Sequence, residues 1–324
     1  MAKIKVAVIG YGQMGRWHTS KVAASAVAEL AAVVETDPSA SAQAAQARWP
    51  VVAELKEVLA HIDAAIIATP ASTHYVIARE LLAAHKHVFC EKPVTLTVAE
   101  AQTLQNMASK VPGLVFQVGH SERWAEIWEW FTPAGGPPGW PGAAMLRVPG
   151  TWYFKRLAPF SGRGSDTDVV ADLMIHDIDL MLWHLAALPQ EVVATGHKIR
   201  TAQWDHVTAG FKFASGHQVW IMAGRHWPSK ERGLTVVNEL GVLQIDLLNQ
   251  QARWAARDQA EALGPLVFKY APRDHLQREQ ESFYQAIQEQ RRPLVGLAEG
   301  KDALAVGEMV QQALRQTVWI KKIV

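Results

Sequence analysis

The sequence predicts an α/β protein of two domains: a parallel sheet covered by helices in residues 1–120, and an α+β domain with a large, mostly antiparallel sheet in residues 121–324. The first 120 residues alternate short apolar runs with longer amphipathic stretches, which is typical of a parallel sheet covered on both faces. Beyond Ala143, longer strand-like runs dominate. The length of 324 residues suits about two domains of ~100–200 residues, and 49% apolar residues suffice for two cores.

In the first domain, apolar runs alternate with stretches that carry apolar residues at three- and four-residue spacing. The expected strands are Ile4–Ile9, Leu30–Val34, Ala64–Ala68, His87–Cys90 and Leu114–Val118. The expected helices are Met14–Val27, Ser39–Arg48, Thr73–Ala84 and Val98–Ser109. Right-handed crossovers between these strands give a Rossmann-type domain.

The second domain is expected to leave one face of its sheet uncovered. Two runs joined by Ser215-Gly216, namely Asp205–Phe213 and His217–Gly224, predict a hairpin. Long helical stretches are expected at Asp168–Ala187, Arg273–Gln290 and Ala298–Gln316. So few helices cover only one face of a large sheet, and the apolar residues Val219, Trp220 and Met222 favour a protein partner on the other. We therefore expect a homodimer, or a dimer of dimers, formed through this sheet.

Composition restricts the classes of partner and compartment. Lysine plus arginine, 32, nearly equals aspartate plus glutamate, 31, so no global field attracts nucleic acid or an anionic membrane. A single cysteine, Cys90, excludes an intrachain disulfide and a multi-cysteine metal site, which fits a reducing compartment. The N-terminus enters a strand pattern without signal-peptide features, and no apolar stretch reaches ~18 residues. We expect a cytoplasmic protein.

A glycine-rich turn, Gly10-Tyr11-Gly12-Gln13-Met14-Gly15, follows the first strand and opens the first helix. In this context the first glycine permits a tight turn, the second lets a pyrophosphate approach the backbone, and the third lets the helix pack on the strand. The N-terminus of the helix then presents free N–H donors to the phosphates. The run therefore predicts a dinucleotide site.

Two acids, Glu35 and Asp37, follow the second expected strand, and Glu35 lies about 20 residues after Gly15. An acid at this position accepts hydrogen bonds from the ribose 2′-OH of NAD and repels the 2′-phosphate of NADP. We therefore expect NAD rather than NADP. The alternative for either acid is a turn or capping role before Pro38.

Two further segments end at the carboxyl edge of the same sheet, where open α/β sheets hold their ligands. Thr69-Pro70 and His74 follow one strand, and Glu91-Lys92-Pro93 follows the next. Proline keeps the residue before it out of the helical region, so an apolar strand delivers Lys92, with a restricted backbone, to the ligand edge. We expect Lys92 to take part in chemistry. The plain alternatives are a solvated lysine at a strand end and a solvated His74 in a first helical turn.

A second polar cluster lies on the expected helix Asp168–Ala187. Asp172, His176 and Asp179 are spaced by four and three residues, so a helix places them on one face of an otherwise apolar segment. The alternatives are a solvated face with i,i+4 pairs, or a metal site, since histidine and aspartate are also ligands. No partner cluster elsewhere in the sequence supports a metal, and we expect none.

Together these motifs resemble the Gfo/Idh/MocA family of sugar and cyclitol oxidoreductases over nearly the whole chain. The matching segments are GYGQMG at 10–15, ATPxxxH at 68–74, EKP at 91–93, the run Asp172–Asp179 and the segment His275–Phe283. The resemblance implies a Rossmann domain, a second domain whose sheet dimerises, and an active site between them. It also implies that Lys92 is the catalytic lysine and that His176 and Asp172 complete the catalytic group.

Within that family, the runs Gly119–Trp124 and Val170–Asp179 are similar to those of nucleotide-sugar 3-dehydrogenases. The implied reaction is oxidation of UDP-N-acetylglucosamine at C3 by NAD, and its product would feed an aminotransferase that makes a 3-amino sugar for lipid A. The run Trp124–Glu126 departs from the usual Phe-Asn-Pro, which leaves the acetamido end of the pocket open. Basic candidates for the substrate pyrophosphate are Arg123, Lys155, Arg156 and Arg163, although Lys155 and Arg156 could equally be solvated strand ends.

The expected ligand contacts follow from these motifs and the resemblance. The residues expected to bind the dinucleotide are Gly10, Gly12, Gln13, Met14, Gly15, Glu35, Asp37, Thr69, Pro70, His74 and Glu91. The residues expected to bind the substrate are Glu122, Arg123, Trp124, Arg163 and Asp179.

Removal of the hydroxyl proton can be assigned in two ways. A lysine side chain titrates near ~10.4 in water, so a lysine base needs burial or a neighbouring positive charge, such as oxidised nicotinamide. A histidine titrates nearer neutrality, so His176 could be the base, with Asp172 orienting its ring and Lys92 polarising the oxygen. Both assignments stay open.

Two other classes of function also stay open. One is a different enzyme on the same frame: a dehydrogenase of a uronic-acid nucleotide sugar or a cyclitol such as inositol, or an NAD-dependent glycosidase. The other is a non-enzymatic NAD-binding regulator. Lys92 and His176 together argue against the regulator, because a regulator needs no proton acceptor.

Overall fold

The structure, a computed structural model, describes residues 2–133, 135–162, 167–258 and 264–316. Its contacts divide the chain into two compact units. The first comprises Met1–Ser121 and Asp274–Lys301, and the second comprises Glu122–Arg273 and the residues from Asp302 onward. The N-terminal segment of the first unit thus ends one residue beyond the expected boundary at residue 120. The first unit also includes Asp274–Lys301, which we had expected in the second domain.

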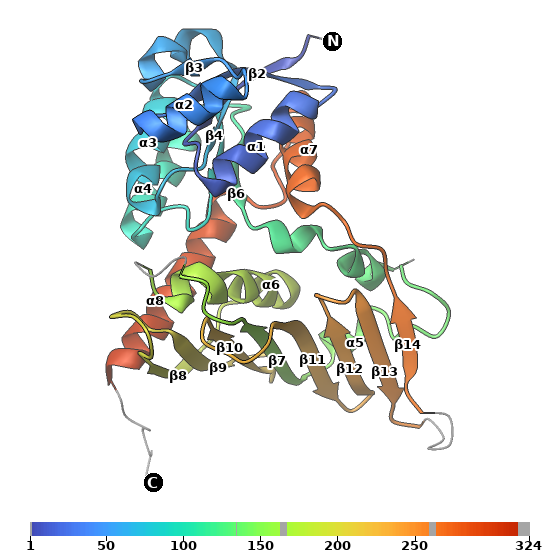
Figure 1. Cartoon of the computed structure of the whole chain (residues 1–324). Helices are drawn as coiled ribbons and strands as arrows, with labels where there is room; N and C mark the ends of the chain where they lie inside the picture. Colours follow the sequence, from blue (N-terminus) through green and yellow to red (C-terminus); the bar gives the residue numbers. More distant parts are fainter. Residues whose placement is uncertain (1, 134, 163–166, 259–263, 317–324) are drawn as a thin grey trace. The chain divides into compact units, whose positions relative to one another are not determined.

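The first unit contains a parallel sheet in the order β3-β2-β1-β4-β5-β6 (Figure 1). Its strands are β1 Ile4–Ile9, β2 Ala28–Val34, β3 Val51–Val52, β4 Ala64–Ile67, β5 His87–Glu91 and β6 Phe116–Gly119, all paired in parallel. Its helices are α1 Gln13–Ala24, α2 Pro38–Gln46, α3 Ala71–Ala83, α4 Val98–Ala108 and α7 His275–Gln288. The strand order reverses between β1 and β4, which is where open α/β sheets bind ligands. The predicted Rossmann-type sheet is confirmed.

Helix α7 belongs to the first unit because its apolar face packs on this sheet. Phe283 and Tyr284 are buried in one cluster with Val8, Ile66 and Phe89 of the central strands. The strands supply continuous apolar runs, as expected for a sheet buried on both faces. The chain therefore returns to its first sheet after most of the second unit, and this places α7 residues beside His18 and Lys21 of α1.

The second unit contains a sheet in the order β14-β13-β12-β11-β7-β10-β9-β8 (Figure 1). Its strands are β7 Gly150–Leu157, β8 Glu191–His197, β9 His206–Lys212, β10 Gln218–Gly224, β11 Glu231–Asn238, β12 Gly241–Asp246, β13 Gln251–Ala256 and β14 Leu266–Lys269. The pair β7 and β10 is parallel, and the other pairs are antiparallel. The large, mostly antiparallel sheet and its predicted hairpin, β9 with β10, are confirmed.

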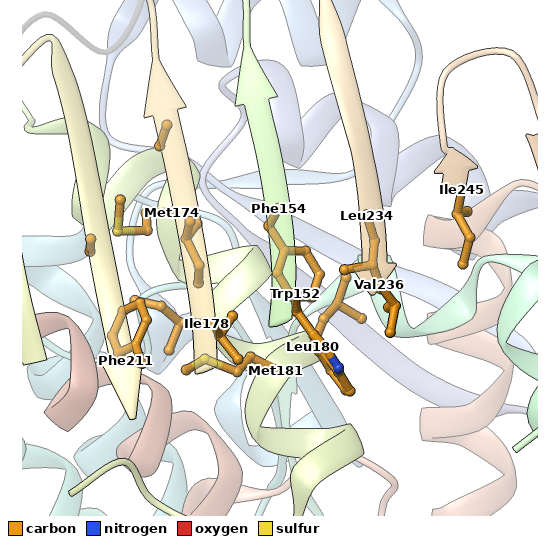
Figure 2. Close-up of a cluster of buried hydrophobic side chains, with 14 of the residues drawn as sticks. Trp152, Phe154, Met174, Ile178, Leu180, Met181, Phe211, Leu234, Val236 and Ile245 are labelled. Carbon is orange, nitrogen blue, oxygen red and sulfur yellow. The ribbon is translucent and has the colours of Figure 1, made fainter. Parts of the chain in front are cut away.

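Helices of the second unit cover one face of this sheet. They are α5 Ala144–Arg147 and α6 Ile175–Leu185, and α8 Leu297–Gln316 spans the division between the units. Figure 2 shows side chains of α6, such as Ile178 and Met181, pointing among strand residues such as Trp152 and Phe211, where they form a buried core. The helix differs from the prediction at its start, because Val170–Met174 is a π-helical turn.

The opposite face of the second sheet carries partly exposed apolar side chains. Tyr153 is 44% exposed, and Trp220 and Met222 are half-buried. Val219, which we grouped with Trp220 and Met222, is buried in the core instead. The reason is the two-residue period of a strand, which sends adjacent side chains to opposite faces.

Candidate active site

The glycine-rich turn has the geometry that a dinucleotide requires. Gly10 has φ of 91°, and a Cβ there would lie 2.8 Å from the Ala68 carbonyl oxygen, so only glycine fits. A Cβ on Gly15 would lie 2.0 Å from the Gly10 carbonyl oxygen, whereas a Cβ on Gly12 would meet nothing within 4 Å. Gln13 and Met14 form the first turn of α1, and no side chain caps that helix. Open space over Gly12 and an uncapped N-terminus fit an approaching phosphate.

Glu35, the predicted ribose ligand, is fixed beside this turn. Its Oε2 accepts a hydrogen bond of 2.6 Å from the Tyr11 backbone N–H, and its Oε1 accepts one of 2.8 Å from the Asp37 N–H. A carboxylate can accept about four hydrogen bonds, so capacity remains for ribose hydroxyls. Asp37 is exposed and caps α2 by accepting from the Ala40 N–H. The structure thus brings Glu35 to the glycine turn and gives Asp37 a helix-capping role.

His74 joins the two loops that follow β4 and β5. The ring is buried, with Nε2 2.9 Å from the Thr69 carbonyl oxygen and Nδ1 2.8 Å from the Pro93 carbonyl oxygen. The Thr69 side chain in turn lies against Gly10, where a Cβ would be 2.9 Å from its methyl group. Pro70 is exposed ahead of α3. The loops after β1, β4 and β5 therefore form one connected edge, as predicted from their positions after parallel strands.

Lys92 lies at this edge directly after β5, half-buried, with a cis peptide bond to Pro93. The preceding Glu91 is 8% exposed, accepts a hydrogen bond of 2.8 Å from His18 Nε2 at Oε1, and lies 3.3 Å from the Lys92 N–H at Oε2. Burial alone would raise the pKa of Glu91, but the His18 hydrogen bond and the nearby Lys92 and His74 hold that pKa below its ordinary value. Cys90 is fully buried, and burial raises the pKa of its thiol, as suits an inert core residue.

The three residues of the predicted polar face in the second unit differ in burial and in local helix type. Asp172 lies in the π-helical turn and His176 in the first turn of α6, both half-buried. Asp179 is buried and accepts two hydrogen bonds from Arg123, Nε to Oδ2 at 2.7 Å and Nη2 to Oδ1 at 2.6 Å. The structure therefore brings two predicted substrate residues, Arg123 and Asp179, into contact with each other.

A second buried ion-pair network lies beside them. Arg156 donates to Asp177 through Nε and Nη2, at 3.0 and 2.7 Å, and to Glu122 through Nη1 at 3.0 Å. Arg232 also donates to Glu122, at 3.0 Å. Burial disfavours charge on Arg156, but Asp177 and Glu122 raise the pKa of its guanidinium. Arg156, a candidate for binding the substrate pyrophosphate, thus already pairs with buried carboxylates of the protein. The Arg232 side chain is partly exposed.

The remaining predicted substrate residues have different surroundings. Trp124 is half-buried, and its indole Nε1 is buried with no hydrogen-bond partner among the described residues. Lys155 is exposed on the opposite face of β7 from Arg156 and pairs with Glu231 at 3.3 Å. Arg163 lies outside the described residues.

In the part of the chain that the structure describes, no three histidine, cysteine or acidic side chains come together as metal ligands could. Within the same residues, no helix combines the length and the apolar content needed to cross a bilayer.

Comparison with known proteins identifies the family. Residues 4–120 match the family model described as the oxidoreductase family with an NAD-binding Rossmann fold, and residues 142–244 match the GFO/IDH/MocA C-terminal domain. UDP-N-acetylglucosamine 3-dehydrogenase from Acidithiobacillus ferrooxidans is 32% identical over 97% of this chain and 98% of its own length. The chain belongs to the Gfo/Idh/MocA family.

Solved structures agree with this membership. A structure of the Acidithiobacillus ferrooxidans UDP-N-acetylglucosamine 3-dehydrogenase matches with a TM-score of 0.87 at 31% identity, covering 98% of this chain and 99% of that chain. Scyllo-inositol dehydrogenase from Lactobacillus casei matches with a TM-score of 0.78 at 19% identity, covering 97% of both chains, and shows the fold alone. This Gfo/Idh/MocA protein is therefore an oxidoreductase that uses a nicotinamide dinucleotide.

Sequence reasoning missed several residues that organise this Gfo/Idh/MocA site. It did not predict the pairing of Arg156 with Asp177 or the contact of His18 with Glu91. The alternation Trp152, Phe154, Arg156 along β7 was a signal that Arg156 faces the core. The four-residue spacing of His18 and the buried Val22 was a similar signal on α1.

Proposed function

We propose that the protein oxidises the 3-hydroxyl of UDP-N-acetylglucosamine with NAD, giving the 3-keto nucleotide sugar. The observation that carries the oxidoreductase chemistry is the connected edge of the first unit. There the Thr69 loop contacts the glycine turn on one side and is joined to the Lys92 turn through His74 on the other. The choice of substrate is supported by the full-length similarity to a UDP-N-acetylglucosamine 3-dehydrogenase.

The residues divide into those that hold the dinucleotide and those that handle the proton. The α1 N-terminus and the open backbone at Gly12 would hold its pyrophosphate, and Glu35 would accept from its ribose hydroxyls. Oxidised nicotinamide, when bound, accepts the hydride that leaves C3. Because Glu35 is a carboxylate that would repel a 2′-phosphate, we propose NAD rather than NADP.

Oxidation of the C3 carbinol requires a base for the hydroxyl proton while the hydride leaves carbon. We propose Lys92 and His176 as the catalytic residues, with Asp172 assisting His176. Either Lys92 takes the proton, or His176 takes it while the Lys92 ammonium stabilises the developing charge on the oxygen. Arg123 and Asp179 hold each other in a buried pair and Glu122 is bound by two arginines, so we propose that these three give the substrate-binding part of the second unit a fixed shape. We propose that Trp124, which is half-buried next to Arg123, also lines the substrate pocket.

The proposal extends to the setting of the reaction. A 3-keto nucleotide sugar is a substrate for transamination, so we propose functional coupling to an aminotransferase that makes a 3-amino sugar, in a cytoplasmic route toward lipid A. The partly exposed Tyr153, Trp220 and Met222 support association of two or more copies through the open face of the second sheet. Light scattering at micromolar concentration should give a mass above that of one 35.7 kDa chain.

Activity is tested by the appearance of NADH on mixing the protein with NAD and UDP-N-acetylglucosamine, with an amino donor and partner aminotransferase to remove the product. Lys92→Met should lower kcat by about 10²–10⁴-fold, because it removes one partner in proton transfer. Near-normal turnover by Lys92→Met would end either role for that lysine. Parallel reactions should include inositols and UDP-N-acetylglucosaminuronate, since inositol 2-dehydrogenase from Rhizobium meliloti is 27% identical over 68% of this chain. If NADH forms with one of these compounds and not with UDP-N-acetylglucosamine, that compound is the better candidate for the substrate.

A further inference from the structure

The Lys92 turn, residues Glu91–Pro93, is held from two sides by buried histidines. His18 on α1 contacts the Glu91 carboxylate before Lys92, and His74 on α3 contacts the Pro93 carbonyl oxygen after it. Both imidazoles are almost completely buried, with exposures of 0% and 1%. The two contacts thus flank Lys92 directly along the chain.

The protonation of the His18 ring follows from its neighbours. The Gln280 side-chain amide of α7 places Nε2 3.3 Å from the His18 carbonyl oxygen, which can only accept, so this end of the amide is the NH₂ donor. The same Nε2 lies 2.7 Å from His18 Nδ1, which must therefore accept. The ring proton is consequently on Nε2, from which it is donated to Glu91.

The contact at the other end of the Gln280 amide is compatible with this orientation. Its Oε1 accepts a hydrogen bond of 3.1 Å from the Tyr284 hydroxyl, one turn further along α7. The His18 ring packs edge-on against Phe89 with centroids 5.1 Å apart. The chain of contacts Tyr284, Gln280, His18, Glu91 therefore has one consistent direction of donation, and it ends at the Lys92 turn.

The carboxylate of Glu91 has little freedom to move. A Cβ on Gly119 of the neighbouring strand β6 would lie 3.0 Å from Glu91 Oε2 and 3.2 Å from its Cα, so the glycine leaves just enough room. On the far side of the turn, His74 Nε2 reaches the Thr69 carbonyl oxygen, which ties Pro93 to the loop beside Gly10. The position of Lys92 relative to the glycine turn is thus set by a continuous set of contacts.

We propose that His18 and His74 are positioning residues for Lys92, and that Gln280 on α7 selects the nitrogen of His18 that donates to Glu91. This inference rests on the catalytic role proposed for Lys92. It adds that residues in α7, which follow Lys92 only after the whole segment Glu122–Arg273 of the second unit, control how well that lysine is aligned for proton transfer. None of the three positioning residues needs to touch the substrate or the cofactor.

The first test compares matched variants of the full chain. His18→Leu removes the donor to Glu91, whereas His18→Gln replaces it with an amide N–H of similar reach. We expect His18→Leu to lower kcat about 100-fold with KM for both substrates changed less than about threefold, because misplacement affects the transition state more than ground-state binding. His18→Gln should recover kcat to within about tenfold of wild type, and His74→Leu should lower kcat in the same manner as His18→Leu.

Gln117→Leu is the control for a purely structural effect. Gln117 is fully buried on β6 and donates from Nε2 to the Glu279 carbonyl oxygen of α7, a hydrogen bond that involves no residue of the Lys92 turn. It should lower stability as Gln280→Leu does and leave kcat per folded enzyme unchanged, whereas Gln280→Leu should lower kcat. Equal kcat values for His18→Leu and Gln117→Leu, after correction for the folded fraction, would overturn the proposal.

The second test needs neither substrate nor activity. In the free enzyme labelled with ¹⁵N-histidine, His18 should show a protonated Nε2 and an unprotonated Nδ1, with the signal assigned by its loss in His18→Gln. Gln280→Leu should release this preference. A proton on Nδ1 in the wild type would refute the network, and this holds even where His18→Leu does not fold. If the wild type is inactive toward UDP-N-acetylglucosamine, the proposed substrate is wrong. The ¹⁵N spectrum still tests the hydrogen-bond network in that case.

Discussion

The two units bury carboxylates in different ways. In the first unit, Glu35 and Glu91 accept their hydrogen bonds from uncharged donors, namely backbone N–H groups and the His18 ring. In the second unit, Glu122, Asp177 and Asp179 pair with arginines. Uncharged donors stabilise a carboxylate but leave its negative charge in place, whereas a guanidinium cancels it. The first unit thus keeps charge at its ligand edge, and the second uses its charges internally.

This difference matches what each unit has to do. Ribose hydroxyls and a lysine ammonium respond to a retained negative charge, so Glu35 and Glu91 can act on groups beyond their own hydrogen-bond donors. The ion-pair network of the second unit instead fixes the helix that carries His176, because Asp177 and Asp179 follow that residue closely on α6. The helix is held by buried charge pairs. Removing one member of such a pair leaves the other charge buried and unpaired, which lowers the free energy of unfolding.

The largest effect that would sharpen this comparison is expected from Arg156→Met. The substitution leaves Asp177 and Glu122 buried without their main cation, and breaking a buried pair in this way costs about 3–5 kcal/mol. Urea unfolding at neutral pH should show this loss as a lower midpoint with an unchanged slope. The double variant Arg156→Met/Asp177→Leu should recover part of it, since apolar replacement of a whole pair is often neutral. A loss below about 1 kcal/mol for the single variant would mean that the pair is not buried in solution.

The pH dependence of stability should have opposite signs for the two kinds of carboxylate. The pKa of Glu91 is lowered from 4.5, so its contribution is complete above that value and is lost as the pH falls through the folded pKa. Burial raises the pKa of Asp177 above 3.8 despite Arg156, so its contribution is complete below 3.8 and is lost as the pH rises through the folded pKa.

These signs are checked by measuring the free energies of unfolding of wild type, Glu91→Gln and Asp177→Asn between about pH 3 and pH 7. This range brackets the ordinary carboxyl pKa values of about 4. The difference between wild type and Glu91→Gln should grow with pH. The difference between wild type and Asp177→Asn should shrink over the same range. Parallel curves would contradict the contrast between the two units.

The parts of this site that the sequence could predict are those encoded locally. Gly10, Glu35 and Lys92 follow apolar strands of a regular alternation, so their shared edge follows from parallel pairing alone. The contacts between His18 and Gln280 or between Arg123 and Asp179 join residues 262 and 56 positions apart, which no local pattern specifies.

Other misses come from irregular backbone geometry and from the way strand faces were assigned. The expected helix Asp168–Ala187 was taken as a continuous α-helix, but Val170–Met174, which contains Asp172, is a π-helical turn. Val219 was placed with Trp220 although a strand alternates its faces. The first error was not visible in the sequence, because apolar periodicity does not distinguish one π turn, whereas the second could have been avoided by counting in twos.

A smaller effect is expected from Glu35→Ala in the first unit. Removing a carboxylate held by uncharged donors should lower kcat/KM for NAD about tenfold, a change of about 1.4 kcal/mol, since ribose hydrogen bonds are lost. The activity with NADP should fall less or rise, because repulsion of its 2′-phosphate also disappears. Glu29→Ala, an exposed acid on the same strand β2, is the control and should change neither value. An unchanged ratio of NAD to NADP activity in Glu35→Ala would remove Glu35 from cofactor selection.

The smallest effect is expected from Lys155→Ala. This variant compares an exposed ion pair of the second unit with the buried pairs of the same unit. Lys155 and Arg156 are neighbours on β7, but Lys155 faces outward and its pair with Glu231 is 53% and 35% exposed. Exposed pairs contribute about 0–1 kcal/mol because water screens them, so urea unfolding should change by about 0.5 kcal/mol or less. KM for the substrate should stay at its wild-type value, because the outward face of β7 is opposite the ion-pair network. A rise in KM of about tenfold would instead support Lys155 as the phosphate ligand and show that charge on the outer face is functional.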